Sequence, residues 1–143
     1  MQPQGQNEEA MKKHFLLTIL ALMVITSNVQ AQKGIDKIFA NQEWMQEHLG
    51  DKNLVILHVG DSASYAKGHI EGAQLITRPS FARVVGDLYW ELPETPDFTK
   101  VLSGFGVNNK SQIVIVNGTS GHAAGFRLYF TLDYFGLGKR RKY

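Results

Sequence analysis

Two almost uninterrupted apolar runs, at residues 54–59 and 112–116, restrict the fold of this 143-residue chain more than any other feature. A strand with one face in water alternates apolar and polar residues, whereas a strand of a parallel sheet covered on both faces is apolar at nearly every position. Helix-like segments follow both runs, and such alternation favours right-handed crossovers. The sequence therefore predicts an α/β domain with an open parallel sheet and helices on both faces.

Capping residues predict the helices of this domain. Asn41 is expected to begin a helix that runs to residue 49 and ends at Gly50. Residues 62–67 form one or two helical turns in this prediction, with Asp61 or Ser62 as the cap. The buried face of the first helix is expected to carry Trp44, Met45 and Leu49.

Further along the chain, a strand is expected at 73–76. Residues 77–96 are predicted to be a loop with a short extended piece at 88–90, because prolines and a glycine interrupt any regular spacing of apolar residues. A helix capped by Asp97 or Thr95 is expected to run to Ser103. A second one spans 123–135, with Gly136 as its C-cap and apolar residues on nearly all sides.

The N-terminus has the pattern of a secretory signal. Lys12 and Lys13 precede an apolar stretch at 15–25, and small residues flank a cleavage site after Ala31. The stretch is shorter than the roughly 20 residues that span a bilayer. We expect residues 1–31 to be a signal peptide with an over-long start, Met11 to be the initiator, and residues 32–143 to be a periplasmic or secreted domain without a stable membrane anchor. A buried core helix is the alternative.

The chain contains no cysteine. An exported domain of this kind must hold its core without disulfides, and it has no thiolate nucleophile, no thiolate zinc ligand and no redox pair. The four basic residues at 139–142 raise the net charge, but residues 32–138 carry nine Lys and Arg against eleven Asp and Glu. We therefore expect no nucleic-acid partner.

A glycine-rich segment follows the helical turns at 62–67. It reads Tyr65-Ala-Lys-Gly68-His69-Ile70-Glu-Gly72-Ala73. We expect a positive φ at Gly68 to end the turn, Ile70 to enter the core, and Gly72 and Ala73 to pass close to a neighbouring backbone. His69 is expected to bind loop backbone rather than to take part in catalysis.

This segment resembles the rhodanese-like domains, in which an aromatic residue precedes Gly-His-Ile-x-Gly-Ala. Further matches follow in order at 43–49, 92–109, 113–116 and 123–136, so the resemblance covers about residues 35–138. It is strongest to the non-catalytic first domain of tandem-domain thiosulfate/3-mercaptopyruvate sulfurtransferases. One departure lies at the end of the strand predicted at 54–59, which is the second strand in the family's order. The family often has Asp and Arg there, whereas this chain has His58 and Gly60.

The resemblance also locates the site. Catalytic members have a cysteine directly after the fourth strand, and the next five residues form a loop whose N–H groups cradle an anion. Here Asn117 stands at the cysteine position, and the expected anion-binding loop continues through Gly118, Thr119, Ser120, Gly121 and His122, with Arg127 one turn into the helix. The resemblance implies an inactive domain that needs no cofactor or metal.

Two roles are compatible with that site. The domain is expected to serve as a structural or regulatory partner of a second rhodanese-like domain, which would bear the cysteine and take sulfur from thiosulfate or a mercapto acid. The alternative is a stand-alone module without cysteine that binds thiosulfate, another small anion or a protein partner. A related phosphatase is a further possibility, but such enzymes also use a cysteine.

Other chemistries fit the sequence less well. Ser120 and His122 are too close on one short loop for a nucleophile and its base, and no Gly-x-Ser-x-Gly elbow is present. His58, His69 and His122 lack the spacing of a metal site, and His58 within its apolar strand is expected to be a hydrogen-bonded core histidine.

Residues 138–143 are charged and predict no strand, so the domain is expected to lack its last strand and helix. In the family's sheet order that strand lies between the first strand, near 35–39, and the strand at 112–116. Its absence would leave two rows of backbone groups unpaired and the chain poorly stable.

Overall fold

A computed structural model describes residues 11–19, 38–118, 122–138 and 141–143. The chain divides into two units, 1–37 and 38–143. Within the first unit, residues 11–19 form a helix on which Phe15, Leu16 and Leu17 are exposed. No helix among the described residues is long and apolar enough to cross a membrane.

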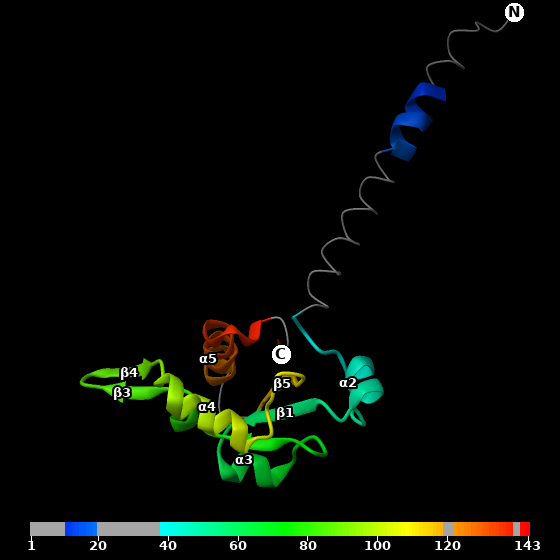
Figure 1. Ribbon diagram of the computed structural model, residues 1–143. Coiled ribbons are helices and arrows are strands. Elements are labelled where there is room, and N and C mark those ends of the chain that lie inside the picture. Colours follow the sequence, from blue (N-terminus) through cyan, green and yellow to red (C-terminus); the bar gives the residue numbers. More distant parts are fainter. Residues whose placement is uncertain (1–10, 20–37, 119–121, 139–140) are drawn as a thin grey trace, which may run out of the picture. The chain divides into compact units, whose positions relative to one another are not determined.

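The second unit is built on a parallel sheet with the strand order β2-β1-β5-β6 (Figure 1). Its centre is the pair β1 (Leu54–Val59) and β5 (Gln112–Asn117), which runs in register from Leu54 opposite Gln112 to Val59 opposite Asn117. The shorter β2 (Gln74–Ile76) pairs with the other edge of β1. The two apolar runs are thus confirmed as adjacent parallel strands.

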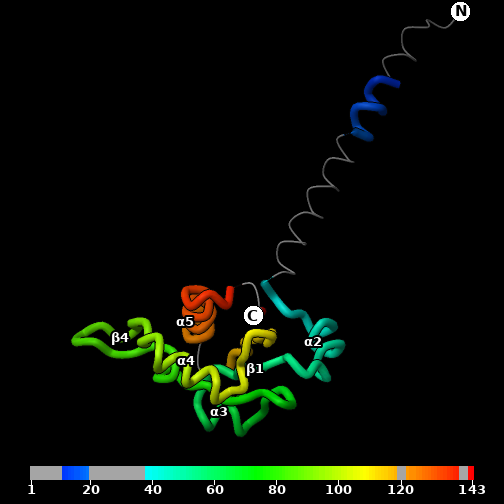
Figure 2. The backbone as a smooth tube through the Cα atoms, in the orientation of Figure 1, coloured from blue at the N-terminus to red at the C-terminus, as the bar shows by residue number. Residues whose placement is uncertain are grey.

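Helices cover both faces of this sheet, as predicted (Figure 2). Successive side chains of a strand point to opposite faces. Val55, Leu57 and Val59 pack on one face with residues of α4 (Thr95–Gly104) and α5 (His122–Leu132). Ile56 packs on the other face with Met45 of α2 (Gln42–His48).

Side-chain caps fix the starts of two helices. Asn41 Oδ1 accepts the N–H of Trp44 at 2.8 Å, which confirms Asn41 as the cap of α2. At α3 (Ser62–Lys67), Asp61 Oδ1 accepts the N–H of Ser64 at 2.7 Å, and Ser64 Oγ in turn contacts the N–H of Asp61 at 3.3 Å. This capping box selects Asp61 of the two predicted caps.

Three local predictions are wrong. Helix α2 ends at His48, one residue before Leu49. The Leu49 side chain therefore does not belong to the buried face of the helix and is 43 % exposed. Helix α4 begins at Thr95, and its N-cap is Glu94, which makes no capping bond, so neither Asp97 nor Thr95 is the cap. Pro96 is tolerated in the first turn because an N–H group at that position would have no helical partner. Gly68 has an extended φ of 162°, and the left-handed glycine of that segment is Gly72 at 76°.

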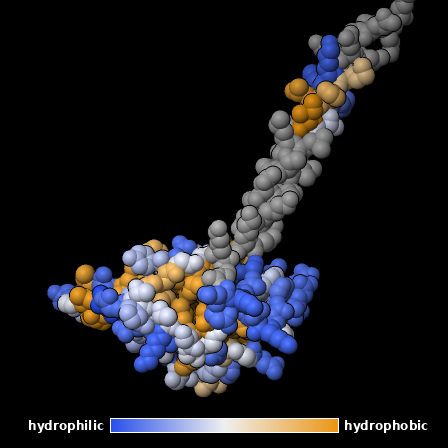
Figure 3. All heavy atoms as spheres, viewed as in Figure 1, coloured by the Kyte–Doolittle hydropathy of each residue, from blue (hydrophilic) through white to orange (hydrophobic). Residues whose placement is uncertain are grey.

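The segment predicted as a loop contains an antiparallel hairpin. It follows a 3-10 turn, η1 (Arg78–Ser80), and pairs β3 (Arg83–Val85) with β4 (Leu88–Glu91), the extended piece that was predicted. Figure 3 shows apolar residues on this hairpin, of which four are largely exposed: Val84, Val85, Leu88 and Tyr89. A two-stranded ribbon with both faces exposed has no apolar alternation, and for this reason the pattern did not predict it.

The C-terminal segment corrects a larger prediction. After α5, a wider helical turn, η2 (Asp133–Leu137), contains a kink at Gly136, whose φ of 82° is left-handed, and its C-cap is Gly138 rather than the predicted Gly136. Then β6 (Arg141–Lys142) pairs with β5. Next to it, the N–H of Tyr143 donates to Ile38 O at 2.7 Å, and the N–H of Ala40 donates to Tyr143 O at 2.9 Å. A two-residue strand therefore occupies the place where none was expected, and the backbone of the next residue, Tyr143, pairs with the segment before α2.

Leu57 offers a direct test of this core. Its side chain is 0 % exposed at the centre of the sheet, so we expect Leu57→Ala to lower the free energy of unfolding by about 2–5 kcal/mol. Leu49→Ala, at an exposed position, is the matched control and should cost less than about 0.5 kcal/mol. Urea denaturation followed by circular dichroism measures both values, and equal losses would contradict the packing described above.

Candidate functional site

The candidate site lies at the carboxyl ends of β1 and β5, where ligands of parallel sheets commonly bind. The register places Val59 opposite Asn117, and the N–H of Gly118 donates to Val59 O at 2.9 Å. This bond extends the strand pairing by one step. It also uses the first N–H group of the predicted anion-binding loop, which is therefore not available to a ligand.

Asn117 is held in place by two aromatic side chains. Its Nδ2 donates to the phenol oxygen of Tyr143 and lies 3.3 Å from Nδ1 of His122. The Tyr143 ring stacks on Phe126, with centroids 4.6 Å apart, and burial raises the pKa of its phenol while the hydrogen bond with Asn117 opposes that shift. The last residue of β5 thus carries an immobilised carboxamide, which has no ionisable nucleophile.

The glycine-rich segment forms one wall of the site. His69 Nδ1 lies 2.9 Å from Tyr65 O, and the two rings stack with centroids 3.8 Å apart. The Tyr65 hydroxyl donates to Ala73 O at 2.6 Å, which connects α3 to the start of β2. Ile70 packs partly buried against the α2 face of the sheet. His69 therefore contacts the backbone of helix α3 rather than the loop backbone that was predicted.

His58 differs from its prediction. It is only 3 % exposed, and neither ring nitrogen has a hydrogen-bond partner among the described residues, so it is not the hydrogen-bonded core histidine that was expected. Burial lowers its pKa, as does the nearby charge of His69, while Asp61 opposes the shift. A Cβ atom added at Gly118 would lie 2.6 Å from His58 Nε2 and one at Gly60 would lie 3.3 Å away, so both glycines make room for the ring.

A cavity of about 540 Å³ joins these elements. Its described lining brings together His58, His69, His122, Asn117 and Gly118 from four separate segments, with Ser64, Gly68, Ile70 and Val116 completing it. No Asp, Glu, Lys or Arg is among these residues. No three metal-ligating side chains are grouped for a metal ion in the part of the chain that the structure describes.

Some predicted site residues are not part of this cavity. Arg127 does not line it; its guanidinium lies 5.3 Å from the centroid of the Phe130 ring, and its Nε is buried without a described partner. Thr119, Ser120 and Gly121 lie outside the described residues. Sequence reasoning did not identify Tyr143 or Ser64 as site residues, because no local pattern marks a side chain that comes from a distant segment.

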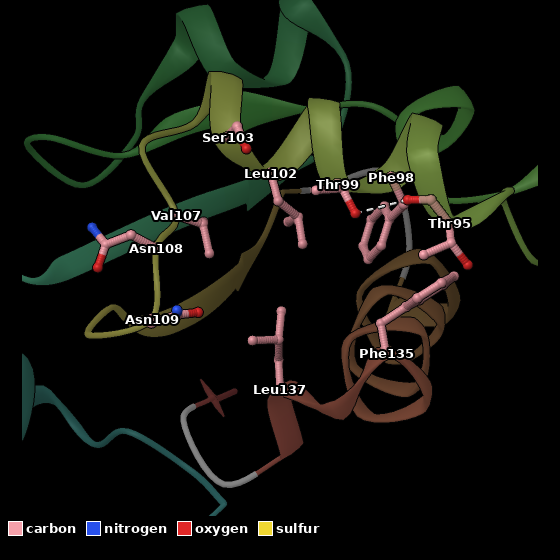
Figure 4. Close-up of a pocket in the computed structure, with 10 residues that line it drawn as sticks. All are labelled: Thr95, Phe98, Thr99, Leu102, Ser103, Val107, Asn108, Asn109, Phe135 and Leu137. Carbon is pink, nitrogen blue, oxygen red and sulfur yellow. Dashed lines mark hydrogen bonds between the residues drawn. The ribbon is translucent and has the colours of Figure 1, made fainter.

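A second cavity, of about 250 Å³, lies between α4 and η2 (Figure 4). Phe98, Leu102, Phe135 and Leu137 point toward its interior, and the hydroxyl of Thr99 at its edge already donates to Thr95 O at 2.8 Å. Its described lining contains no titratable side chain. The first cavity is therefore the better candidate for chemistry or binding.

One comparison with known proteins identifies the family of this domain. The family model described as Rhodanese-like domain matches residues 41–140, which is more than half of the chain. A search of curated protein sequences finds no match. The matched range contains every strand of the sheet except the last one, as well as the cavity residues up to His122. The chain belongs to the rhodanese-like domain family.

Proposed function

We propose that this chain is the non-catalytic rhodanese-like domain of an exported sulfurtransferase of the thiosulfate sulfurtransferase type. Its partner would be a second rhodanese-like domain that bears the cysteine. The observation that carries this proposal is Asn117, which is the last residue of β5 in a chain without any cysteine.

The chemistry of sulfur transfer explains why this residue decides the matter. A thiolate attacks the outer sulfur of thiosulfate and displaces sulfite, holds that sulfur as a persulfide and passes it to an acceptor. A carboxamide has neither the ionisable group nor the nucleophilic atom for the first step. The amide group of Asn117, which is hydrogen-bonded with Tyr143 and His122, also occupies the position that an attacking atom would need.

Exposed aromatic side chains support a partner domain. Phe126, Phe130 and Tyr134 are 53 %, 50 % and 65 % exposed and recur at intervals of four residues, so they follow one side of α5 and its continuation. The hairpin β3–β4 adds a further exposed apolar surface. Contiguous apolar surface of this kind commonly marks a protein interface. In our proposal these surfaces pack against the second domain.

Export is supported by the N-terminal unit. Lys12 and Lys13 precede the exposed apolar side chains of the helix at 11–19, which is the order of charge and hydrophobicity in a signal peptide. The proposed cleavage site, after Ala31, lies outside the described residues.

The cavity at the carboxyl ends of the strands favours the second candidate function. A module without cysteine that binds a small anion or a protein partner requires a preformed pocket with unused hydrogen-bonding groups, and His58 supplies them. This function requires no second domain.

The first test is sulfur transfer by the chain itself. We expect no cyanide-dependent formation of thiocyanate from thiosulfate above the enzyme-free rate, because no nucleophile is present. Asn117→Cys should accept one sulfur atom per chain, measured by mass spectrometry, because it restores a thiol at the position where the resemblance places the family's cysteine. Ser103→Cys, on the exposed side of α4, is the matched control and should accept none. Turnover by the unsubstituted chain would overturn the proposal.

The second test addresses the tandem partner. If this domain works with a cysteine-bearing one, the gene should continue beyond the codon for Tyr143 into a second rhodanese-like segment. That segment should place a cysteine directly after an apolar strand. Genomic sequencing downstream of this codon provides the measurement, and a continuation without such a cysteine would favour the stand-alone module.

The third test addresses export. The chain expressed with its N-terminus intact in a secreting bacterium should appear in the periplasm or medium with Gln32 as its first residue. Mass spectrometry of the N-terminal peptide of the exported protein identifies that residue. Ala31→Leu should block processing because signal peptidase requires a small residue there. A protein that retains residues 11–31 after fractionation would contradict the signal.

A further inference from the structure

The second cavity, between α4 and η2, owes its shape to a break in the last helical turn. A regular helix places residues two apart on nearly opposite sides, because each residue turns the chain by about 100°. Phe135 and Leu137 nevertheless both point into this cavity (Figure 4). The reason is Gly136 between them, whose φ of 82° and ψ of 10° are not helical. Wide helical turns of this kind are rare and are frequently found at functional sites.

The floor of the second cavity is apolar and aromatic. Phe98 and Leu102 of α4 are 1 % and 7 % exposed and belong to the core. The rings of Phe98 and Phe135 have centroids 4.9 Å apart and are tilted by 44°, within the range in which aromatic rings attract each other. Val107 and Leu137 pack partly buried against the same core. A further ring placed against these side chains would therefore gain both aromatic and aliphatic contacts.

The polar groups of the lining select a neutral ligand. The described lining has hydroxyl and amide side chains but no titratable group, so a charged ligand would lose water without gaining a counter-charge. Two of these polar residues are already hydrogen-bonded: the N–H of Lys110 donates to Asn108 Oδ1 at 2.8 Å, and the hydroxyl of Thr99 donates to Thr95 O at 2.8 Å. A peptide backbone would lose its hydrogen bonds to water without regaining them from these groups. An apolar ring has no such bonds to lose.

The volume of the second cavity sets the size of its ligand. An apolar protein cavity of about 150 Å³ binds benzene, which has a single ring. The cavity between α4 and η2 has about 250 Å³, so in the same proportion it accommodates about ten atoms other than hydrogen. A flat molecule of two fused rings has this size.

We propose that the second cavity is a binding site for a small neutral aromatic compound of two fused rings, taken from solution and held by Phe98, Leu102 and Phe135. The driving force is the removal of apolar surface from water, and contacts with the two phenylalanine rings favour a flat ligand. The described linings of the first and second cavities share no residue. The site is therefore independent of both functions proposed above.

Titration of the full chain with indole tests the proposal, because indole is neutral, flat and of the required size. The methyl signals of Leu102, Val107 and Leu137, followed by NMR, should shift as indole is added. We expect a dissociation constant of about 1 mM or lower for a ligand of this size. Shifts confined to Ile70 and Val116, which line the first cavity, or no shift at all, would overturn the proposal.

A substitution that fills the cavity tests the assignment of the site. Val107→Phe adds an aromatic side chain to the lining and should weaken indole binding by about tenfold or more, because the two rings compete for one space. Val84→Phe is the matched control: it makes the same change at a position of β3 that is 54 % exposed and does not line the cavity, so affinity should not change. Undiminished affinity in Val107→Phe would contradict the assignment.

A second ligand, tested on the unsubstituted chain, covers the case in which Val107→Phe fails to fold. N-acetyl-tryptophanamide carries the indole ring on a capped amino acid and imitates an aromatic side chain of another protein. Because the volume of the cavity matches the ring system alone, this compound should bind about tenfold more weakly than indole, or less. Affinity equal to that of indole would assign the cavity to a side chain of another protein and overturn the proposal. The sulfur-transfer assay does not depend on these results, so either hypothesis can fail alone.

Discussion

The parallel pairing of β1 with β5 is the contact on which the rest of this domain depends. It buries two apolar strands along six paired positions and provides both faces on which the helices pack. Because parallel strands end at the same edge, the pairing also brings Val59 next to Asn117 and places His58 beneath the following glycine. The cavity therefore follows from the sheet.

The chemistry of the site follows from Asn117, the last residue of β5. In place of a nucleophile the chain has a carboxamide that Tyr143 and His122 hold in position, so the residue contributes to the stability of this edge of the sheet. Tyr143 connects this network to the segment before α2 through its backbone bonds with Ile38 and Ala40. The side chains around Asn117 thus form one wall of the adjacent cavity, whose described lining includes three histidines.

The sequence predicted those parts of the fold that depend on local patterns. Apolar runs located β1 and β5, and Asn41 and Asp61 identified their helix starts, because a strand covered on both faces and a capped helix each leave a short signature. The hairpin β3–β4 was missed since its exposed strands bury no regular face. The partners of Asn117 and the empty hydrogen-bonding positions of His58 depend on residues distant in the sequence, and no local pattern encodes them.

The space that Gly60 and Gly118 leave around His58 has a consequence for how such a site can evolve. A side chain at Gly118 would collide with the imidazole, since its Cβ atom would approach Nε2 to 2.6 Å. A homologue with a smaller residue at the position of His58 would be freed from this restriction. The three positions therefore constrain one another sterically. During evolution, substitutions at these positions are expected to occur together.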